Sequence, residues 1–361
     1  MSVLRIYAGP KARLHIERHG LSPGDVGVIP GAAGGPKGLI LGALDRFIFG
    51  DWMSASSHPV HLVGASIGAW RMATACLDHP TAAFERLQRD YIAQDYELEP
   101  GRQTPTPAHV SERFGESLRS FYGSRVGEVL GHPRYLLHIV TSRGRHVLGR
   151  EHRVGTPLGY VGAFLTNSVR RKAMGAWLER VVFSSARDGR AVAMPFATTD
   201  YRTRQVVLTD ANFSAALQAS CSIPFVLNAV HDIPGAPRGA YWDGGITDYH
   251  LHLNYNAASP GIVLYPHFQK AVVPGWLDKA FKWRHGATHF LDNTVVIAPD
   301  PDWVKGLPGG KLPDRSDFPR FGSNLQARVK AWTAAAASGC LLADEFKEWL
   351  ARPAITRVEA L

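Results

Sequence analysis

Cysteines, secretion signals and paired metal-binding motifs are scarce or missing in this sequence. Its 361 residues include only three cysteines, Cys76, Cys221 and Cys340, and no Cys-x-x-Cys pair. Neither a disulfide framework nor a zinc knuckle is therefore expected. The first residues, MSVLRIYAGPKAR, lack a basic segment followed by an apolar one, which argues against a secretory signal peptide. A reducing, cytoplasmic location is the default expectation for such a chain.

Long apolar runs are also absent. No uncharged apolar stretch reaches the roughly 18 residues that a bilayer crossing needs, and the best candidate, from Ala331 to Ala343, is short and rich in alanine. The composition is nevertheless 45% hydrophobic and 20% charged, which excludes wholesale disorder and allows a sizeable core. The length fits two average domains or one large α/β domain.

Acidic residues are outnumbered by basic ones, 31 to 40, which gives a formal net charge of +9. Such a balance favours anionic partners, namely nucleic acid, an anionic membrane surface or an acidic substrate, although it also serves solubility alone. None of the known nucleic-acid-binding modules is visible, so no nucleic-acid partner is expected.

Strand and helix patterns alternate from the first part of the chain. A strand over Val26–Ile29, a glycine loop and a helix over Pro36–Phe49 are followed by a strand over Val60–Ala65 and a helix over Ile67–Leu77. This rhythm predicts an α/β fold with a central, mostly parallel sheet between layers of helices. Further strands are expected at Tyr135–Thr141, Arg180–Ser184, Gln205–Leu208, Ala240–Asp243, Ile262–Tyr265 and Thr294–Ala298, and further helices at Thr81–Gln94, Ser214–Ser220 and Leu325–Leu350.

The segment Gly64–Gly68 reads G-A-S-I-G, with the apolar run VHLV before it and the helix-forming run AWRMATACL after it. A strand that turns directly into a helix presents the central serine on a strained turn, and flanking glycines let the two elements approach closely. Ser66 would then lie at a helix N-terminus, where the helix dipole favours a developing oxyanion. The context predicts a nucleophilic serine supported by Gly64 and Gly68, with an ordinary tight turn as the alternative.

The loop Gly31–Gly38 (GAAGGPKG) also lies between a predicted strand and a predicted helix. Its backbone N–H groups should converge and suit an anion or an oxyanion. Nucleotide binding is not expected, because no hydroxyl residue follows Lys37 and Ala33 stands where the dinucleotide motif needs its first glycine. An oxyanion hole for acyl transfer remains, with Gly38 as a supporting residue. Lys37 would either support it electrostatically or extend into solvent.

A third signal is Asp243-Gly244-Gly245, at the end of the short strand AYWD. A carboxylate on a glycine turn can reach a neighbouring loop. Taken alone, the pattern fits a turn in which Asp243 accepts backbone hydrogen bonds. Together with the serine turn and the glycine loop, it predicts a functional carboxylate supported by Gly244 and Gly245.

In order and spacing, the three motifs resemble the patatin-like phospholipase and acyl hydrolase family. That family has a glycine-rich oxyanion loop, a G-x-S-x-G motif a few tens of residues later and Asp-Gly-Gly or Asp-Gly-Ala far downstream. The segment Ala219–Phe225 also looks like the family's helix-to-proline segment. The similarity spans about Gly27 to Gly245, and no motif is recognised in the C-terminal third. Ala33 departs from the family pattern, which usually has the first of three glycines there, but its N–H is retained.

The resemblance implies a patatin-like three-layer α/β/α fold and a Ser-Asp dyad. Ser66 would be the nucleophile and Asp243 its base, with the oxyanion held by the N–H groups of Gly34, Gly35 and Ile67. The chemistry is consistent, since a serine hydroxyl needs a base and a desolvated carboxylate of raised pKa can serve as one. The implied reaction is hydrolysis of lipid acyl esters, as by a phospholipase A, without a cofactor. Alternatives are an esterase or thioesterase for soluble short acyl groups or a polyester, and a catalytically silent lipid-binding module.

The resemblance also suggests one patatin-like domain over residues 1–361, with its core at about 24–300. Three stretches are rich in loop-forming residues: Glu99–Ala108, Asn228–Gly239 and Pro299–Phe321. The last is dense in proline, glycine and aspartate, which is typical of a flap or a boundary. Residues 301–361 are accordingly expected to form a C-terminal flap and a helix that packs on the core.

Histidines provide two competing hypotheses. His250 or His267 could complete a Ser-Asp-His triad, because each follows Asp243 in the order that α/β-hydrolases use. The early position of the serine motif and the glycine loop directly before it favour the dyad instead. His250 and His252 would share one face of a strand, as a metal pair requires. No third ligand stands at convincing spacing, so no metal is expected.

Basic and aromatic residues alternate in Pro274–His285 (PGWLDKAFKWRH). On a helix, Trp276 and Phe281 would share a side bordered by basic residues, which suits peripheral contact with an anionic lipid surface. A helix packed on the core with a solvated basic rim is the favoured interpretation. A second basic cluster, expected to be solvated, comprises Arg143, Arg145, Arg150 and Arg153. The oligomeric state is not indicated.

Overall fold

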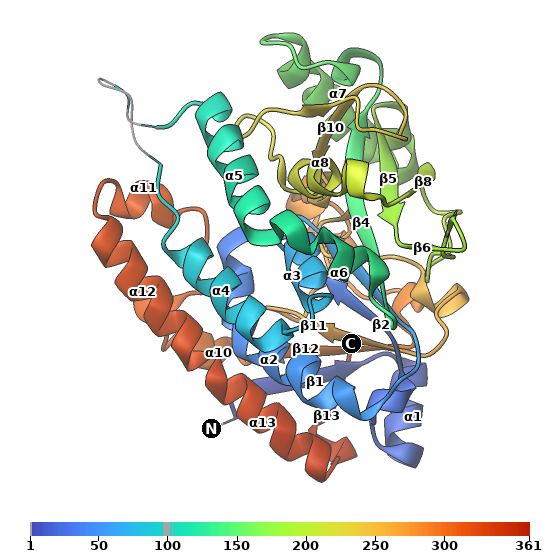
Figure 1. Ribbon diagram of the computed structural model, residues 1–361. Coiled ribbons are helices and arrows are strands. Elements are labelled where there is room, and N and C mark those ends of the chain that lie inside the picture. Colours follow the sequence, from blue (N-terminus) through green and yellow to red (C-terminus); the bar gives the residue numbers. More distant parts are fainter. Residues whose placement is uncertain (1, 97–101, 103) are drawn as a thin grey trace.

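A computed structural model describes residues 2–96, 102 and 104–361, and a large sheet runs through its centre (Figure 1). The sheet has eleven strands in the order β13-β1-β12-β11-β2-β3-β4-β10-β9, with β5 paired to β4 and β8 to β5. Its strands are β1 (Leu4–Ala8), β2 (Val26–Gly31), β3 (Val60–Ala65), β4 (Tyr135–Gly144), β5 (Leu178–Ser184), β8 (Thr203–Val207), β9 (Val230–His231), β10 (Ala240–Asp243), β11 (Ile262–Pro266), β12 (Thr294–Pro299) and β13 (Val358–Ala360). A separate hairpin pairs β6 (Ala186–Arg187) with β7 (Arg190–Ala191).

The central strands β12, β11, β2, β3 and β4 run parallel to one another. They are almost entirely buried, as expected for parallel strands covered on both faces. Helices flank the sheet: α1 (Pro10–His19), α2 (Gly42–Gly50), α3 (Ile67–Ala75), α4 (Pro80–Ile92), α5 (Pro107–Tyr122), α6 (Val126–Gly131), α7 (Gly155–Val169), α8 (Asp210–Cys221), α9 (Gly245–Asp248), α10 (Pro301–Val304), α11 (Asp317–Phe321), α12 (Leu325–Ser338) and α13 (Cys340–Ala351). The predicted three-layer α/β/α architecture with a mostly parallel sheet is confirmed.

Strand register explains how distant parts of the chain meet. Strand β3 pairs with the first part of β4, and the last of these pairs joins Ala65 to Val140. Strand β10 pairs with the next part of β4, where Asp243 lies opposite Thr141. The C-terminal ends of β3 and β10 therefore meet beside β4, and the residue that follows Ala65 is placed next to Asp243.

Two predicted helices differ from the observed ones. The helix expected at Pro36–Phe49 starts as a 3₁₀ helix, η2 (Gly35–Leu41), and becomes α-helical only from Gly42. The helix expected at Leu325–Leu350 is divided into α12 and α13 at Gly339. Gly339 packs closely at this division, since a Cβ there would lie 2.4 Å from the carbonyl oxygen of Ile40.

The three loop-rich stretches differ in the secondary structure that they contain. Part of Glu99–Ala108 lies outside the described residues. Within Asn228–Gly239, Val230 and His231 form strand β9. Pro299–Phe321 contains α10, the short 3₁₀ helix η11 (Pro308–Gly310) and α11.

Both ends of the described chain contribute to the central sheet. Strand β13 pairs in parallel with β1, which in turn pairs with β12. The sheet thus reaches beyond the 24–300 range expected for the core, because β1 and β13 are short strands of five and three residues. Among the described residues, every helix is too short or too polar to cross a bilayer.

Candidate active site

Ser66 occupies the tight turn between β3 and α3, with φ 57° and ψ −131°. Residues other than glycine adopt a positive φ only at a cost in energy, so packing must hold the turn. The flanking glycines are required sterically. A Cβ on Gly68 would lie 1.8 Å from the carbonyl oxygen of Gly31, and one on Gly64 would lie 2.3 Å from Cα of Ala69. The G-x-S-x-G pattern therefore forms the strained strand-to-helix turn that its context predicted.

The Ser66 side chain is hydrogen-bonded to Asp243, as the register of β4 requires. Ser66 Oγ donates to Asp243 Oδ2 over 2.7 Å. The other carboxylate oxygen, Oδ1, accepts from the N–H of Gly245 over 2.7 Å. Both side chains are buried, and the residues are only 3% and 5% exposed. One carboxylate oxygen is thus held by the backbone while the other faces the serine hydroxyl.

Burial raises the pKa of Asp243 above its usual value, since the charged form loses hydration. The nearby Arg315 charge and the hydrogen bonds from Ser66 and Gly245 act in the opposite direction but do not cancel the effect of burial. A carboxylate of raised pKa is a stronger base than one in water. The environment of Asp243 therefore suits proton abstraction from Ser66.

The C-terminal turn of α8 supports both members of the pair. The N–H of Ser66 donates to Ser220 Oγ over 2.9 Å, and Ser220 Oγ donates to the carbonyl of Val140 over 2.7 Å. The N–H of Asp243 donates to the carbonyl of Ser222, and that of Gly244 to the carbonyl of Ser220. Sequence analysis identified the segment Ala219–Phe225 by resemblance but missed the contact of Ser220, which no spacing rule would reveal.

The glycine loop lies directly against the serine turn, since a Cβ on Gly38 would lie 3.5 Å from the Ile67 side chain. Gly34 and Gly35 both have positive φ, at 156° and 57°. In the part of the chain that the structure describes, the N–H groups of Gly34, Gly35 and Ile67 have no hydrogen-bond acceptor. Three donors beside Ser66 are thus left for a ligand.

Ala33 and Lys37 serve the loop in other ways. The N–H of Ala33 donates to the carbonyl of Tyr249 over 2.9 Å, so it anchors the loop and leaves no donor for a ligand. The ammonium of Lys37 lies 5.2 Å from the centroid of the Phe268 ring, and burial lowers its pKa. The side chain therefore packs on an aromatic ring instead of extending freely into solvent.

The histidines of the competing hypotheses make their hydrogen bonds to other groups. Within the described chain, neither His250 nor His267 is hydrogen-bonded to Ser66 or Asp243. Nδ1 of His250 contacts the carbonyl of Ala271, and burial lowers the pKa of His267 to about 3. The structure thus shows a serine and a carboxylate in direct contact, without an imidazole between them.

The suggested metal pair is also separated. His252 Nε2 contacts the Thr288 hydroxyl over 3.1 Å, whereas His250 contacts Ala271. Over the described residues there is no group of three or more His, Cys, Asp or Glu side chains arranged to hold a metal ion.

Two cationic side chains that sequence analysis did not assign to the site lie close to it. Nε of Arg315 is 3.5 Å from the position that a Cβ on Gly35 would occupy. The Lys279 ammonium lies 3.9 Å from the centroid of the Tyr249 ring. Burial, followed by the positive charges of Lys37 and Arg315, lowers the pKa of Lys279 to about 8. Arg315 and Lys279 therefore act electrostatically on Asp243, and Lys37 of the glycine loop lies near Lys279.

The two basic segments of the sequence differ from their predicted forms. Pro274–His285 is not one helix but two short 3₁₀ helices, η8 (Trp276–Ala280) and η9 (Lys282–Arg284), because the chain turns at Phe281. In the second cluster, Arg143 pairs with the buried Glu179 and Arg145 donates to the carbonyl of Gly175. Arg150 and Arg153 remain exposed.

A serine on a strand-to-helix turn of a mostly parallel sheet, facing a buried carboxylate and a glycine loop, is the arrangement of an α/β acyl hydrolase. Comparison with protein families agrees with this class. The model of the patatin-like phospholipase family matches residues 32–250, more than half of the sequence. The chain therefore belongs to the patatin-like phospholipase family, whose members act on lipid acyl esters. A search among curated proteins found no match.

Proposed function

We propose that this protein is a serine acyl hydrolase that cleaves lipid acyl esters by phospholipase A chemistry, with Ser66 and Asp243 as a catalytic dyad. The main support is the 2.7 Å hydrogen bond from Ser66 Oγ to a buried carboxylate of raised pKa. Membership of the patatin-like phospholipase family supports the lipid substrate class.

The proposed reaction has two steps. Asp243 accepts the proton of Ser66 as Oγ attacks the ester carbonyl carbon, and the resulting oxyanion is held by the N–H groups of Gly34, Gly35 and Ile67. When the C–O bond breaks, Asp243 returns the proton to the leaving alkoxide, and an acyl-Ser66 ester remains. Asp243 then takes a proton from water as the water oxygen attacks the ester carbon, and it passes that proton to Ser66 Oγ when the ester bond breaks, which releases the carboxylic acid and restores both side chains. The N-terminus of α3 adds its dipole to the stabilisation of the oxyanion.

Two features favour a phospholipid over a short neutral ester. Arg315 and Lys279 lie near Asp243, with Lys37 near Lys279, and a phosphate-bearing headgroup would complement their charge. A pocket opens beside Gly35 and Ile67, and its wall is mostly apolar. Its apolar lining includes Leu39, Phe84, Leu87 and Tyr91. Since the cavity has a volume of only about 20 Å³ and Asp45, Arg71 and Gln88 also line it, it would take the first methylene groups of an acyl chain and not a whole chain.

The test is a hydrolysis panel that runs from short p-nitrophenyl esters to phospholipid vesicles. Ser66→Ala is expected to abolish turnover, and Asp243→Asn to lower kcat by about 10³-fold or more. A fluorophosphonate probe should label Ser66 in the folded wild-type protein. His267→Ala is the control for the triad hypothesis, and it should retain activity.

Three results would each replace part of the proposal. Loss of activity in His267→Ala together with full activity in Asp243→Asn would favour a triad. Absence of probe labelling in folded protein would favour a lipid-binding module without catalysis. Turnover of short esters but not of vesicles would favour the soluble esterase.

For location, we propose a cytoplasmic protein that contacts a membrane peripherally.

A further inference from the structure

Helix α7 presents a stripe of large apolar side chains to solvent. Residues Thr156, Gly159, Tyr160, Ala163 and Asn167 are buried against the body of the protein. The opposite side carries Val154 at the start of the helix and then Leu158, Val161, Leu165 and Val169 at helical spacing, each more than half exposed. An exposed apolar surface of this kind usually marks an interaction site.

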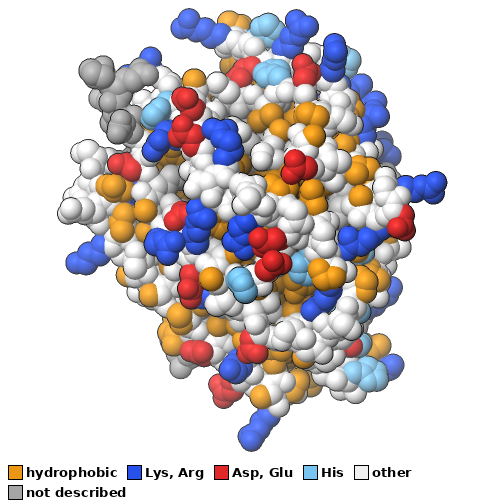
Figure 2. All heavy atoms as spheres, in the orientation of Figure 1, with side chains coloured by type: hydrophobic (Ala, Val, Ile, Leu, Met, Phe, Trp, Pro, Cys, Tyr) orange, Lys and Arg blue, Asp and Glu red, His pale blue; other side chains and the backbone are white. Residues whose placement is uncertain are grey.

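Charge is distributed around this stripe in a distinctive way. The chain has no charged residue between Arg153 and Arg170. Exposed basic residues stand at both ends of the helix: Arg150 and Arg153 before it, and Arg170 and Lys172 after it. Glu151 is the one acidic residue among them. Figure 2 shows Lys and Arg side chains along the upper edge of the molecule, where α7 lies in Figure 1.

Aromatic contacts on the body side of α7 connect the helix to the candidate active site. Tyr160 of α7 contacts both Phe225 and Trp242, and Trp242 precedes Asp243 in the chain. On the next turn, Phe164 stacks on Phe281, which contacts Trp283. Phe225 is 56% and Trp283 is 74% exposed. The buried side of α7 therefore packs on the residue that precedes Asp243, and two exposed aromatic side chains, Phe225 and Trp283, add to the apolar surface near the helix.

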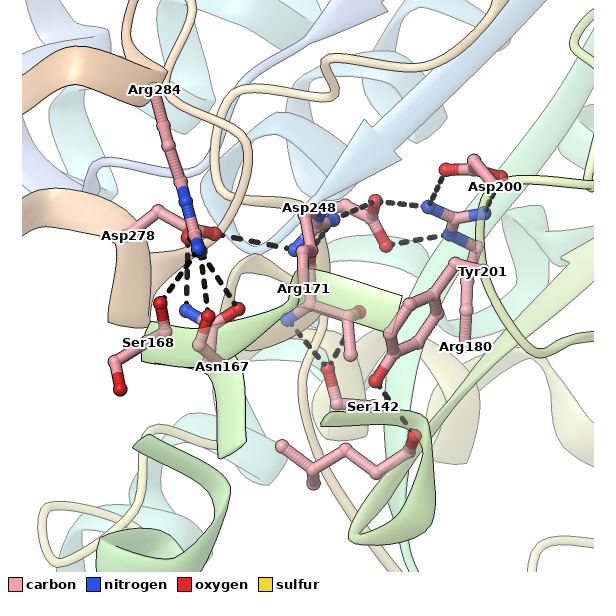
Figure 3. Close-up of polar contacts among 12 residues, drawn as sticks. Ser142, Asn167, Ser168, Arg171, Arg180, Asp200, Tyr201, Asp248, Asp278 and Arg284 are labelled. Atoms are coloured by element: carbon pink, nitrogen blue, oxygen red, sulfur yellow. Dashed lines mark hydrogen bonds and ion pairs between the residues drawn. The ribbon is translucent and has the colours of Figure 1, made fainter. Parts of the chain in front are cut away.

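A buried ionic network holds α7 in place (Figure 3). Asn167 on the inner side of α7 donates to Asp278, and Arg284 donates to Asp278 and to the carbonyl of Asn167. Arg171 contacts both Asp278 and Asp248, at 3.3 Å each. Because Asp248 ends α9, the short helix after Asp243, α7 is fixed to the elements of the site. The exposed stripe thus belongs to a well-anchored helix.

We propose that α7 docks the protein on the surface of an anionic bilayer, with its apolar stripe among the acyl chains and its flanking basic residues in the headgroup layer. This inference rests on the proposed function, since α7 packs on Trp242, the residue before Asp243 of the proposed dyad. An exposed apolar stripe without charge, bordered by Arg and Lys, can bury its apolar side chains at such an interface while the cations meet the anionic headgroups. A second copy of the chain is disfavoured as the occupant, because pairing two α7 helices would bring like charges together.

The first test measures binding of the Ser66→Ala protein to vesicles of phosphatidylcholine with one-third phosphatidylglycerol. Because this variant should not hydrolyse lipid, the experiment measures binding alone. The docking proposal can therefore be confirmed even if the proposed hydrolase function is wrong. Adding Leu158→Ser and Leu165→Ser should lower the partition coefficient at least tenfold, since burial of one leucine side chain alone corresponds to about tenfold or more. Removal of Arg170 by Arg170→Gln should lower it about fivefold.

The matched control is Leu14→Ser with Leu341→Ser, two leucines of similar exposure, 45% and 49%, on α1 and α13. Its binding should equal that of the parent protein. The proposal would be overturned if the α7 variant bound the anionic vesicles as strongly as the parent protein. It would also be overturned if the parent protein bound pure phosphatidylcholine vesicles as strongly as anionic ones. A dimer of the parent protein that the α7 variant converts to a monomer while vesicle binding persists would overturn it as well.

A second variant covers the case in which the leucine changes impair folding. Val161→Trp places an indole on the exposed stripe without removing apolar surface. Its fluorescence is expected to shift to shorter wavelength on anionic vesicles and to be quenched by brominated acyl chains. A parallel variant, Leu341→Trp, should show neither change. The same spectrum with and without vesicles for Val161→Trp would refute docking through α7.

Discussion

The variant Ser220→Ala should show how far the Ser220 hydroxyl stabilises the turn at Ser66, without any change in the two residues of the proposed dyad. Ser220 Oγ accepts from the N–H of Ser66 and donates to the carbonyl of Val140, and the whole residue is buried. These two contacts tie the strained turn at Ser66 to strand β4. Alanine removes both contacts but leaves Ser66 and Asp243 unchanged.

The expected cost can be worked out from these contacts. A buried donor or acceptor that loses its partner costs about 1–3 kcal/mol, and the substitution leaves such groups on Ser66 and Val140. A positive-φ serine also stores about 1–3 kcal/mol of strain, which relaxes if the turn is released. Allowing for that relaxation, the free energy of unfolding should fall by about 2–4 kcal/mol. Turnover should fall by about tenfold or more, because Oγ of Ser66 moves relative to the carboxylate.

Urea denaturation and hydrolysis of a short ester would measure the two effects. Ser222→Ala is the matched control, since Ser222 is also buried but its hydroxyl donates only to the carbonyl of Gln218 within α8. That variant should lose less than about 1 kcal/mol and keep its turnover. If Ser220→Ala and Ser222→Ala are equally stable and equally active, the proposed support of the turn is wrong.

Three further predictions concern strain and charge. Ser66→Gly should be more stable than Ser66→Ala by about 1 kcal/mol, because only glycine adopts the observed φ without strain; equal thermal midpoints would contradict this. The pKa of Lys279 is lowered to about 8, so at pH values above about 8 the side chain loses its charge and KM for an anionic phospholipid should increase. The Lys279→Arg protein should show no such increase. An increase in both proteins would show that another group is responsible. Burial raises the pKa of Asp200, but the charge and hydrogen bond of the Arg180 guanidinium lower it by more, so the pKa is lowered overall. The Asp200–Arg180 ion pair therefore contributes to the stability of the fold at neutral pH, and this contribution is lost as the pH falls through the lowered pKa of Asp200. Asp200→Asn should accordingly lose less stability than wild type between pH 6 and pH 3 in urea titrations, and parallel curves would count against the ion pair.

The parts of the fold that sequence patterns predicted are those with one dominant local signal. Strand β3 and strand β10 have the predicted bounds, because short apolar runs end at glycine-rich turns. The serine turn was likewise predicted from its context. The contact between Ser66 and Asp243 was expected only through resemblance, since it depends on the register of β3 and β10 along β4, which no local pattern encodes.

Helix α7 and the cations near the site illustrate what local patterns cannot show. The helix is apolar on its buried and its exposed side, so the contrast that normally reveals an amphipathic helix is weak. The better signal was the uncharged stretch between Arg153 and Arg170, which is longer than Ala331–Ala343. Arg315 lies in a loop-rich stretch, where only tertiary structure brings it to Gly35.

The C-terminal third packs against the candidate site although the family model does not match it. Arg315 follows the matched range, and α12 packs on η2, the 3₁₀ helix that carries Lys37. Glu345 of α13 accepts hydrogen bonds from the N–H groups of Val3 and Leu4, so the two ends of the described chain are joined.

We therefore propose that residues 1–361 form one cooperative domain instead of a core with a separable flap. Strand β13 adds to β1, α13 holds the start of β1, and Gly339 packs on the backbone of Ile40, so the last segments cannot detach without exposing the edge of the sheet. Calorimetry should show a single unfolding transition, lost together with fluorophosphonate labelling of Ser66. Two resolved transitions, with labelling retained after the first, would mean that the C-terminal segments fold apart from the site.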